Sequence, residues 1–548
     1  MFPKEKFRRQ IFESTTVDSI LAVIPSQTVC EQYVSLYTSF LPSIYQILHI
    51  PTFQQHYERF WNTEQEDNPS FRAEFAFQLA LVAAIGSKYQ HFNDQGDTNP
   101  SNFDPLRVCA IVNAWLSGLD FKQRVQLNTL QTSYLLILSK RILSVPPAEL
   151  WLSTGDLVRS ALAIGLQKDP DEVDPQIPPF QAELRRRLWY AIAELDVELS
   201  ILCRMPSLVQ VVPYSCRCPA GSESGDTVVE IAESSNGLQT DDVKQNFHQA
   251  ALAKSLPSRL HALSILTEGQ PNANEIRKAL KHLEYQRSSL PSNLRLSDDV
   301  SGPTELFNSV MLEMCYRRPM ISLTTLGLQC DGYLDTKDDV TRCIGLCMAV
   351  MSMSETLDPS LSDHEFISNG QLWAFFQTFN CDDIIRAAYN ACLCLKLVAT
   401  NSDTAQTARG LRPILNLELD IPKSTVKRTI EDLIKTFVNW KPDLRAALKQ
   451  LIGLSLVLEL TKHTRNEAGK QTQMRAALQR VLQLCQERYS ADSNHGSHEE
   501  NSSDSLSSAP TLDFDQFMGS DFAMDSVPLE WGLDFFPDES LNLPFTNA

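Results

Sequence analysis

The stretch Ala182–Cys203, AELRRRLWYAIAELDVELSILC, decides the fold of this chain. Its leucine and isoleucine side chains recur every three or four residues, which is the spacing of one face of an α-helix. The set is Leu184, Leu188, Ile192, Leu195, Leu199 and Leu202. The spacing therefore predicts a long helix that packs a single apolar face on its neighbours.

The same period recurs along the chain. It predicts further helices over 74–89, 124–143, 150–166, 304–328, 340–353, 384–398 and 423–440. Stretches rich in Pro, Gly, Ser, Asn and Asp interrupt them and are expected loops: 93–104, 169–179, 213–242, 288–303 and 400–411. No alternating Val/Ile/Thr-rich run recurs often enough to build a sheet, and no fixed-period repeat is present. We expect an all-α, multi-helix body.

Length and composition limit the class of protein. The chain has 548 residues and 43% hydrophobic residues, which predicts an ample core but more than one ordinary domain. No uninterrupted apolar run reaches the roughly 18–20 residues of a membrane helix, and the start, MFPKEKFRRQ, lacks the apolar stretch of a signal peptide. Thirteen Cys, mostly in apolar segments, are typical of reduced core thiols. We expect a soluble intracellular protein without a membrane association.

The charge is unevenly distributed. The formal net charge is −19, and residues 491–548 hold twelve acids and no Lys or Arg. This region opens with SADSNHGSHEENSSDSLSSAP (490–510), whose composition cannot bury enough apolar area to offset the entropy of ordering. Residues 491–510 are therefore a predicted disordered linker, and an acidic chain of this kind argues against sequence-independent binding to polyanions.

After the linker, residues 511–548 alternate acids with bulky aromatic side chains. Acidic–hydrophobic alternation is typical of a disordered activation segment, in which like charges keep the aromatic rings solvated until they insert into a partner. The predicted anchors are Phe514, Phe517, Phe522, Trp531, Phe535 and Phe536. We expect this tail to bind the transcription machinery or a coactivator; the alternative is an acidic solubilising tail.

Four motifs in fixed order resemble one family. They are ILHIPTF (47–53), GDLVRSALAIGLQKDP (155–170), ELRRRLWYAIAELD (183–196) and YRRPMISL (316–323). Together they resemble the regulatory "middle homology" domain of fungus-specific transcription factors, the binuclear zinc-cluster regulators, over roughly residues 30–450. Matched positions include His49, Arg159, Gly165, Asp169, Glu183, Arg186, Trp189 and Asp196.

Some positions depart from the family pattern. Gln167 stands where the family commonly has His, and Arg204 and Met205 replace the usual Gly and Arg before Pro206. We interpret these departures as drift at packing positions. A larger departure is the family's six-cysteine DNA reader, which is not present: the close pairs Cys216/Cys218, Cys343/Cys347 and Cys392/Cys394 have the wrong spacing for it. Cys216 and Cys218 lie in a predicted loop, and we do not expect them to bind a metal.

Two explanations of the missing reader remain open. Either a zinc cluster is encoded upstream of Met1, with Lys4, Lys6, Arg8 and Arg9 ending its basic linker, or the protein reaches DNA only through a partner protein. Homo- and heterodimers are open alternatives in both cases. Zinc is expected only in the first case, and this chain is predicted to hold no cofactor.

Several conspicuous residues have structural interpretations. Arg185, Arg186 and Arg187 span about 200° of a helix, so they cannot form one phosphate-binding patch and are expected to pair with nearby carboxylates. Trp189 is expected in the core and His49 in a structural hydrogen bond. The basic start KEKFRR is a weak match to a nuclear-import signal.

Enzymatic motifs fail on particular residues. The nearest matches to a magnesium-binding D-D-x-x-D are Asp382-Asp383-Ile384-Ile385-Arg386 and Asp338-Asp339-Val340-Thr341-Arg342, each with an Arg in the fifth place that repels a cation. GSESG (221–225) has Glu where a nucleophilic serine would stand. The chain is predicted not to be an enzyme and to have no catalytic or metal-binding residues.

The sequence thus predicts four regions: a short basic N-terminus (1–29), an all-α regulatory domain (30–490), the linker (491–510) and the activation-like tail (511–548). The resemblance implies a nuclear transcription regulator, an activator of a metabolic or secondary-metabolite gene set. The alternative is a reader-less co-regulator that acts by binding a DNA-binding relative.

Overall fold

In the computed structural model of the chain, all regular secondary structure among the described residues is helical, and no strand occurs among them. The all-α prediction is thereby confirmed. The structure describes residues 16–41, 43–45, 47–62, 69–90, 103–220, 247–268, 272–296, 302–330, 333, 337–359, 361, 370–399, 421–440, 444–461, 475–481, 483–485 and 487.

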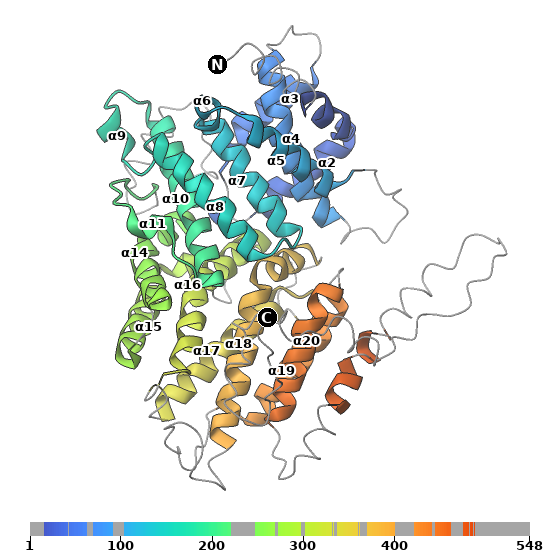
Figure 1. Cartoon of the computed structure of the whole chain (residues 1–548), viewed down its shortest axis with the longest axis vertical. Helices are drawn as coiled ribbons and strands as arrows, with labels where there is room; N and C mark the ends of the chain where they lie inside the picture. Colours follow the sequence, from blue (N-terminus) through green and yellow to red (C-terminus); the bar gives the residue numbers. More distant parts are fainter. Residues whose placement is uncertain are drawn as a thin grey trace, which may run out of the picture. The chain divides into compact units, whose positions relative to one another are not determined.

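The chain forms two compact units. Unit 1 contains residues 1–323 and 352–383, and unit 2 contains residues 324–351 and 384–548. The boundary falls within three helices, α16 (Pro303–Gly327), α17 (Lys337–Leu357) and α18 (Gln371–Ala399) (Figure 1).

The other helices of unit 1 come from its N-terminal three hundred residues. A helix over 16–23 precedes them. They are α2 (Gln27–Phe40), η1 (Ser43–Tyr45), α3 (Ile50–Trp61), α4 (Pro69–Gln90), α5 (Pro105–Gly118), α6 (Phe121–Arg124), α7 (Leu127–Ile142), α8 (Pro147–Ala163), α9 (Pro170–Val173), α10 (Pro179–Cys203), α11 (Leu208–Val211), α14 (Phe247–Thr267), α15 (Ala273–Ser288) and η2 (Ser292–Leu294).

Every helix predicted from the apolar period is present within a few residues of its predicted bounds, except that the predicted 384–398 is the second half of the longer α18. Proline and short polar residues set several helix starts. Pro179 stands in the first turn of α10, where a missing N–H costs nothing. The Asp104 side chain accepts a hydrogen bond from the Leu106 N–H (2.9 Å) and so caps α5.

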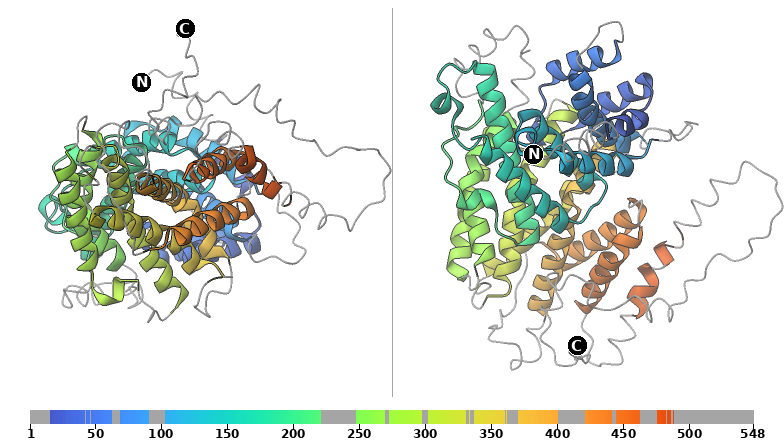
Figure 2. Two further views of the ribbon diagram at one scale, coloured as in Figure 1. Left: turned by 90° about the horizontal axis from the view of Figure 1, so that it is seen from below. Right: turned by 45° about the horizontal axis from the view of Figure 1, so that its top comes forward.

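Helix α10 lies at the centre of unit 1. It packs against α8 and α14, and Figures 1 and 2 show α8 running alongside it. The prediction of a single apolar face is wrong for this helix, because every residue from Leu188 to Leu202 is buried, including the acids Glu194, Asp196 and Glu198. A helix surrounded on all sides must bury its polar residues as well, and these are then costly unless they are paired.

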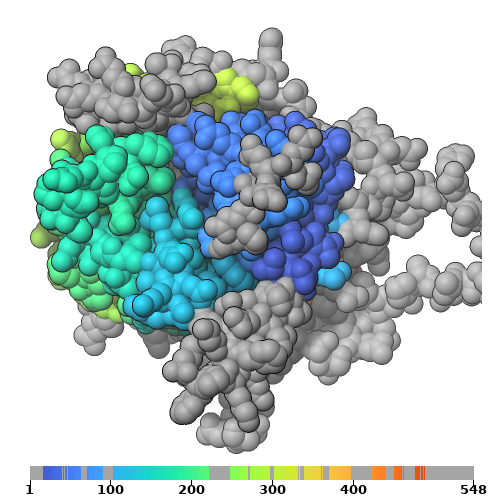
Figure 3. Space-filling model, turned by 90° about the horizontal axis from the view of Figure 1, so that it is seen from above, coloured from blue at the N-terminus to red at the C-terminus, as the bar shows by residue number. Residues whose placement is uncertain are grey.

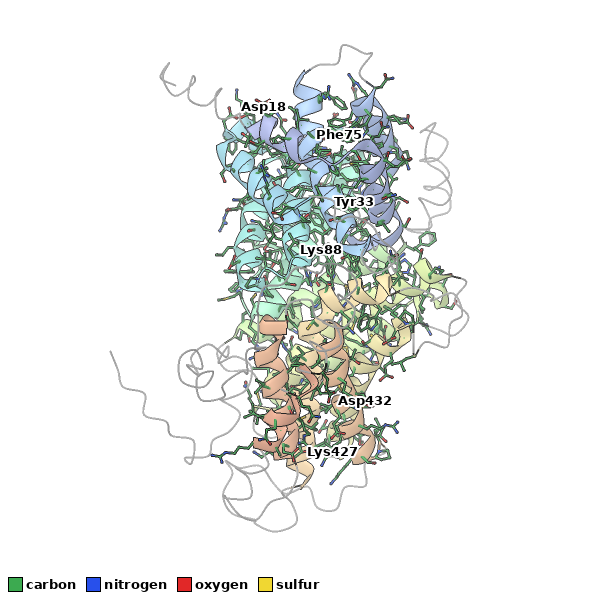
Figure 4. The ribbon with its side chains drawn as sticks, turned by 90° about the vertical axis from the view of Figure 1, so that its right-hand side faces the viewer. Asp18, Tyr33, Phe75, Lys88, Lys427 and Asp432 are labelled. Atoms are coloured by element: carbon green, nitrogen blue, oxygen red, sulfur yellow. The ribbon has the colours of Figure 1, made fainter. Side chains whose placement is uncertain are left out.

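The N-terminal helices pack very closely around α4. At Gly86 of α4, a side-chain Cβ would lie 2.0 Å from the carbonyl oxygen of Tyr33 in α2. Figure 4 shows Tyr33 beside α4, between the levels of Phe75 and Lys88. Only glycine permits this separation of the two helix backbones.

Unit 2 is built from the parts of α16, α17 and α18 named above, with α19 (Lys423–Trp440) and α20 (Leu444–Leu460), which pack on each other (Figure 2). The labelled Lys427 and Asp432 both lie on α19 (Figure 4). In the core, the Cys343 Sγ of α17 lies 3.1 Å from the Cys394 Sγ of α18. All thirteen cysteines are free thiols, and ten are buried, as predicted for core thiols.

Within the described part of the chain, one helix is long and apolar enough to cross a membrane by length and composition: the stretch Asp338–Leu357 of α17, with a mean hydropathy of 1.2. The count of uninterrupted apolar residues had missed it, because charged residues stand among the apolar ones. The same test is passed by helices packed in a protein core, and half of this stretch is buried.

Candidate regulatory centre around helix α10

The predicted activation anchors Phe514, Phe517, Phe522, Trp531, Phe535 and Phe536 lie outside the described residues, as do KEKFRR, the 491–510 linker and Gly221–Gly225. The predicted residues that the structure does place are those of the four motifs. Three of the motifs contribute to charged contacts around α10, and these contacts form two groups, one at each end of the helix.

At the N-terminal end, Asp169 is the common acceptor. Arg186 of α10 donates to both of its carboxylate oxygens, from Nε (3.0 Å) and Nη2 (2.8 Å). Arg217 donates from its backbone N–H (3.0 Å) and its side chain (2.9 Å). Burial raises the pKa of Asp169, but the hydrogen bonds from Arg186 and Arg217 outweigh it and hold the pKa well below the usual range. Asp169 also caps α9 by accepting from the Asp171 N–H (3.2 Å).

Arg187 pairs one turn away. Its Nε lies 2.9 Å from the Glu183 Oε1, which also accepts a hydrogen bond from the Ala220 N–H (3.1 Å). The expected pairing with local carboxylates is therefore confirmed for Arg186 and Arg187. Trp189 is fully buried, and the His49 Nδ1 lies 2.7 Å from the Thr52 Oγ1, so the structural interpretations of both residues are also confirmed.

At the C-terminal end, Glu198 is completely buried and holds three partners. Its carboxylate accepts from the Tyr45 hydroxyl (2.9 Å) and the Arg141 Nη2 (2.7 Å), and it pairs with Arg318. Arg318 in turn donates to the Asp383 Oδ2 (2.6 Å). Two acids and two guanidinium groups thus balance in charge, and they connect η1, α7, α10, α16 and α18 within unit 1.

Burial alone would raise the pKa of Glu198. The guanidinium groups of Arg141 and Arg318 outweigh this effect and lower the pKa to about 2. The carboxylate is therefore ionised at neutral pH, and the arginines keep their protons. A cluster of permanently charged partners offers no proton to transfer and no nucleophile, so its chemistry is structural: it fixes the relative positions of helices.

Two further acids of α10 are satisfied from other directions. Glu194 pairs with Arg259 of α14 (2.6 Å), although burial keeps its pKa raised. Asp196 accepts from the Thr154 Oγ1 of α8 (3.2 Å) and from the Ser207 Oγ (2.5 Å), just before α11. Burial likewise raises the pKa of Asp196.

Metal binding is not indicated where the structure is described: no three His, Cys, Asp or Glu side chains come together there as ligands. The Cys216 carbonyl accepts a hydrogen bond from the Tyr190 hydroxyl (2.8 Å), and the Cys218 Sγ lies 3.8 Å from the oxygen of that Tyr190 hydroxyl. Asp383, a member of one near-match to a magnesium motif, is the partner of Arg318.

Sequence reasoning missed Glu194 and Glu198, and it misread Arg204. The partner of Glu194, Arg259, lies 65 residues away in the chain, and the partner of Glu198, Arg141, lies 57 residues away. No local pattern connects these acids with their arginines. Arg204 ends α10 in the left-handed conformation (φ 52°), which favours glycine. The glycine that the family usually has at this position could have indicated the left-handed backbone. The replacement of that glycine by Arg204 therefore concerns backbone conformation and not packing.

The motif residues that converge on α10 agree with the comparison to known families. The model of the "Fungal specific transcription factor domain" matches residues 34–322, more than half of the chain. That range contains the second half of α2, α3 to α15 and most of α16, with the four motifs except for their last residue, Leu323. No solved structure matches the chain.

Three curated relatives are similar over part of their length. Transcription factor opdR of Penicillium oxalicum is 31% identical over 252 residues, which cover 46% of this chain and 30% of the relative. Transcription factor lepE of Aspergillus flavus is 28% identical over 316 residues, 57% of this chain and 37% of the relative. The Fusarisetin A cluster transcription factor fsa6 of a Fusarium species is 24% identical over 327 residues, which cover 56% of this chain and 42% of the relative.

The chain spans about a third of the length of the first two of these relatives. These relatives are transcription factors and not enzymes, which agrees with the absence of catalytic motifs. The match over more than half of the sequence shows that the chain belongs to the fungal specific transcription factor domain family.

Proposed function

We propose that this chain regulates transcription in the nucleus, as an activator of a secondary-metabolite gene set. The family match over residues 34–322 carries the proposal. One relative is a Fusarisetin A cluster transcription factor, and this similarity supports the choice of gene set. The contacts around α10 support a regulatory body whose core is built from charge pairs between distant helices.

Activation is assigned to residues 511–548. Their alternation of acids and aromatic side chains supports binding to the transcription machinery or a coactivator, with ordering on contact. The bound partner would receive aromatic anchors into an apolar groove, while the acids keep the free tail solvated.

The test is a reporter assay with the full chain and with residues 491–548, each fused to a heterologous DNA-binding domain. Both fusions should activate. Replacing Phe514, Phe517, Trp531, Phe535 and Phe536 by Ala should abolish activation. The matched control replaces five linker residues by Ala, Asn501, Ser502, Ser503, Ser505 and Ser507, and should leave it unchanged. Equal output from the two sets of substitutions would contradict the assignment.

DNA recognition is assigned either to a zinc cluster encoded upstream or to a partner protein. Mapping the 5′ end of the transcript separates the two: a longer frame with six suitably spaced Cys supports a direct DNA-binding activator. A start at Met1 supports a co-regulator that binds a DNA-binding relative. Metal analysis of the 548-residue chain should find less than stoichiometric zinc, and two zinc ions per chain would refute our interpretation of its cysteines.

A further inference from the structure

A pocket of about 150 Å³ lies in unit 1 between α3, α4, α7 and the start of α10. A cavity needs about 10–15 Å³ of such volume to hold one water. The pocket therefore has room for roughly ten waters or one small organic molecule. Protein interiors have few voids larger than a water, and none of the contacts around α10 described above uses this space. Figure 3 views the end of unit 1 where the blue N-terminal residues lie beside the cyan and green ones.

Aromatic rings form much of the wall. Phe75 lies 5.2 Å from Phe53 and 5.9 Å from Phe71, centroid to centroid, and the rings of Phe71 and Phe75 are within 6° of parallel. On the α10 side, Phe180 is held by the edge of the His49 ring at 4.6 Å. The rings support one another before any ligand enters, so the pocket presents preformed flat surfaces, which suit an aromatic guest.

Two buried glutamines supply directed polar groups. The Nε2 of Gln78 in α4 donates to the Asn128 carbonyl (3.1 Å), and the Nε2 of Gln131 in α7 donates to the Ile47 carbonyl (2.9 Å). A carbonyl oxygen can only accept, so these contacts fix which end of each amide is the nitrogen. Both side chains line the pocket, and the atom that each amide can offer a guest as an acceptor is its oxygen.

The charges around the pocket disfavour a charged guest. Glu74 lines it and would repel an anion, whereas the Arg59 guanidinium lies 4.3 Å from the centroid of the Phe71 ring and would repel a cation. Burial and the nearby Arg59 both lower the pKa of His56, another lining residue, so its imidazole is neutral at pH 7.

We propose that this pocket binds a small, neutral, planar aromatic molecule that carries a hydrogen-bond donor, of the phenol class. Its ring would stack among Phe53, Phe71 and Phe75, and its hydroxyl would donate to Gln78 or Gln131. The site joins α3, whose first turn belongs to the first family motif, to α10, which carries the third. Binding is measured directly, so the proposal stands or falls independently of the proposed function.

The test uses the full chain and 4-ethylphenol as the probe, by calorimetric titration and by the shift in Tm. We expect one site per chain and a Tm that rises with probe concentration. 4-Ethylanisole has the same ring but no donor and should bind at least tenfold more weakly. The charged analogues 2-phenylethylamine and 4-methylbenzoate should also bind at least tenfold more weakly than the phenol.

Two substitutions locate the site. Leu127→Trp places a larger side chain in the pocket lining and should reduce affinity for 4-ethylphenol at least tenfold. Leu152→Trp is the matched control, because Leu152 is an exposed leucine on α8 outside the pocket lining, and it should leave affinity unchanged. At least one of the two substitutions Gln78→Leu and Gln131→Leu should weaken binding of the phenol at least fivefold while leaving binding of the anisole unchanged.

Three results would overturn the proposal: equal affinity for the phenol and the anisole, phenol binding that survives Leu127→Trp, or tighter binding of either charged analogue. Failure of 4-ethylphenol to bind at millimolar concentration would overturn it as well. Helical circular dichroism of each variant shows whether the fold is intact, and Leu127→Trp tests the site if Gln131→Leu does not fold.

Discussion

The two ends of helix α10 use the same chemical groups in different surroundings. At its N-terminal end, Arg186 and Arg187 pair with Asp169 and Glu183 while keeping 12% and 18% of their side chains exposed. At its C-terminal end, Glu198 and its partner Arg318 are exposed by 2% or less. The difference teaches that the contribution of an ion pair to stability can be judged only when its burial is known. Removing one partner destabilises the fold most where water cannot take that partner's place.

The largest effect is expected from Glu198→Gln at the buried end. The substitution leaves Arg141 and Arg318 in the core with only Asp383 to balance them, and breaking a buried pair in this way costs about 3–5 kcal/mol. The free energy of unfolding, measured by urea denaturation monitored by circular dichroism, should fall by that amount. A loss below about 1 kcal/mol would show that water reaches the cluster.

The same residue gives a pH dependence. The pKa of Glu198 is lowered from 4.5 to about 2 on folding, so its contribution to stability is fully present above about pH 4.5 and is lost as the pH falls towards 2. The difference in unfolding free energy between the original chain and Glu198→Gln should therefore shrink over that window. A difference that stays constant from pH 5 to pH 3 would contradict the lowered pKa.

An intermediate effect is expected from Asp169→Asn at the partly exposed end. The amide oxygen can still accept one hydrogen bond, but the charge that Arg186 and Arg217 face is removed, which we expect to cost about 1–2 kcal/mol. Asp156→Asn is the matched control, because the Asp156–Arg159 pair is mostly exposed and should contribute less than about 0.5 kcal/mol. Equal losses from the two substitutions would remove the distinction by burial.

The smallest effect is expected at the C-terminus of α10 itself. Arg204→Gly relieves the left-handed backbone, which costs a non-glycine residue about 1 kcal/mol. The unfolding midpoint in urea should therefore rise by an amount equivalent to no more than about 1 kcal/mol. A decrease would mean that the Arg204 side chain stabilises the fold by more than its backbone strain costs.

The apolar period predicted the helices well because it depends only on neighbours within a few turns. The extent of α10 followed from its leucine spacing. The tail anchors Phe514 and Trp531 stay predictions, since they lie outside the described residues.

The buried acids could not be predicted in this way. Glu198 reads as part of a polar face until Arg141 and Arg318, from two other helices, are placed around it. The same holds for the pocket, whose lining comes from four helices separated in the sequence. Asp169, Glu183 and Asp196 were indicated beforehand, through their matches to family motifs and not through their spacing.

The opening of unit 2 can be measured by chemical labelling of two thiols in its core, Cys343 and Cys394. Cys343 and Cys394 are 3% exposed or less, and a hydrogen bond with a neighbouring thiol, together with burial, raises the pKa of both thiols well above the usual value. The thiolate is the nucleophile that attacks an alkylating reagent and displaces its leaving group, so the reaction must wait until α17 and α18 separate and the thiols reach water. The rate of labelling at these two positions therefore reports how often the core of unit 2 opens, without any probe having to be introduced.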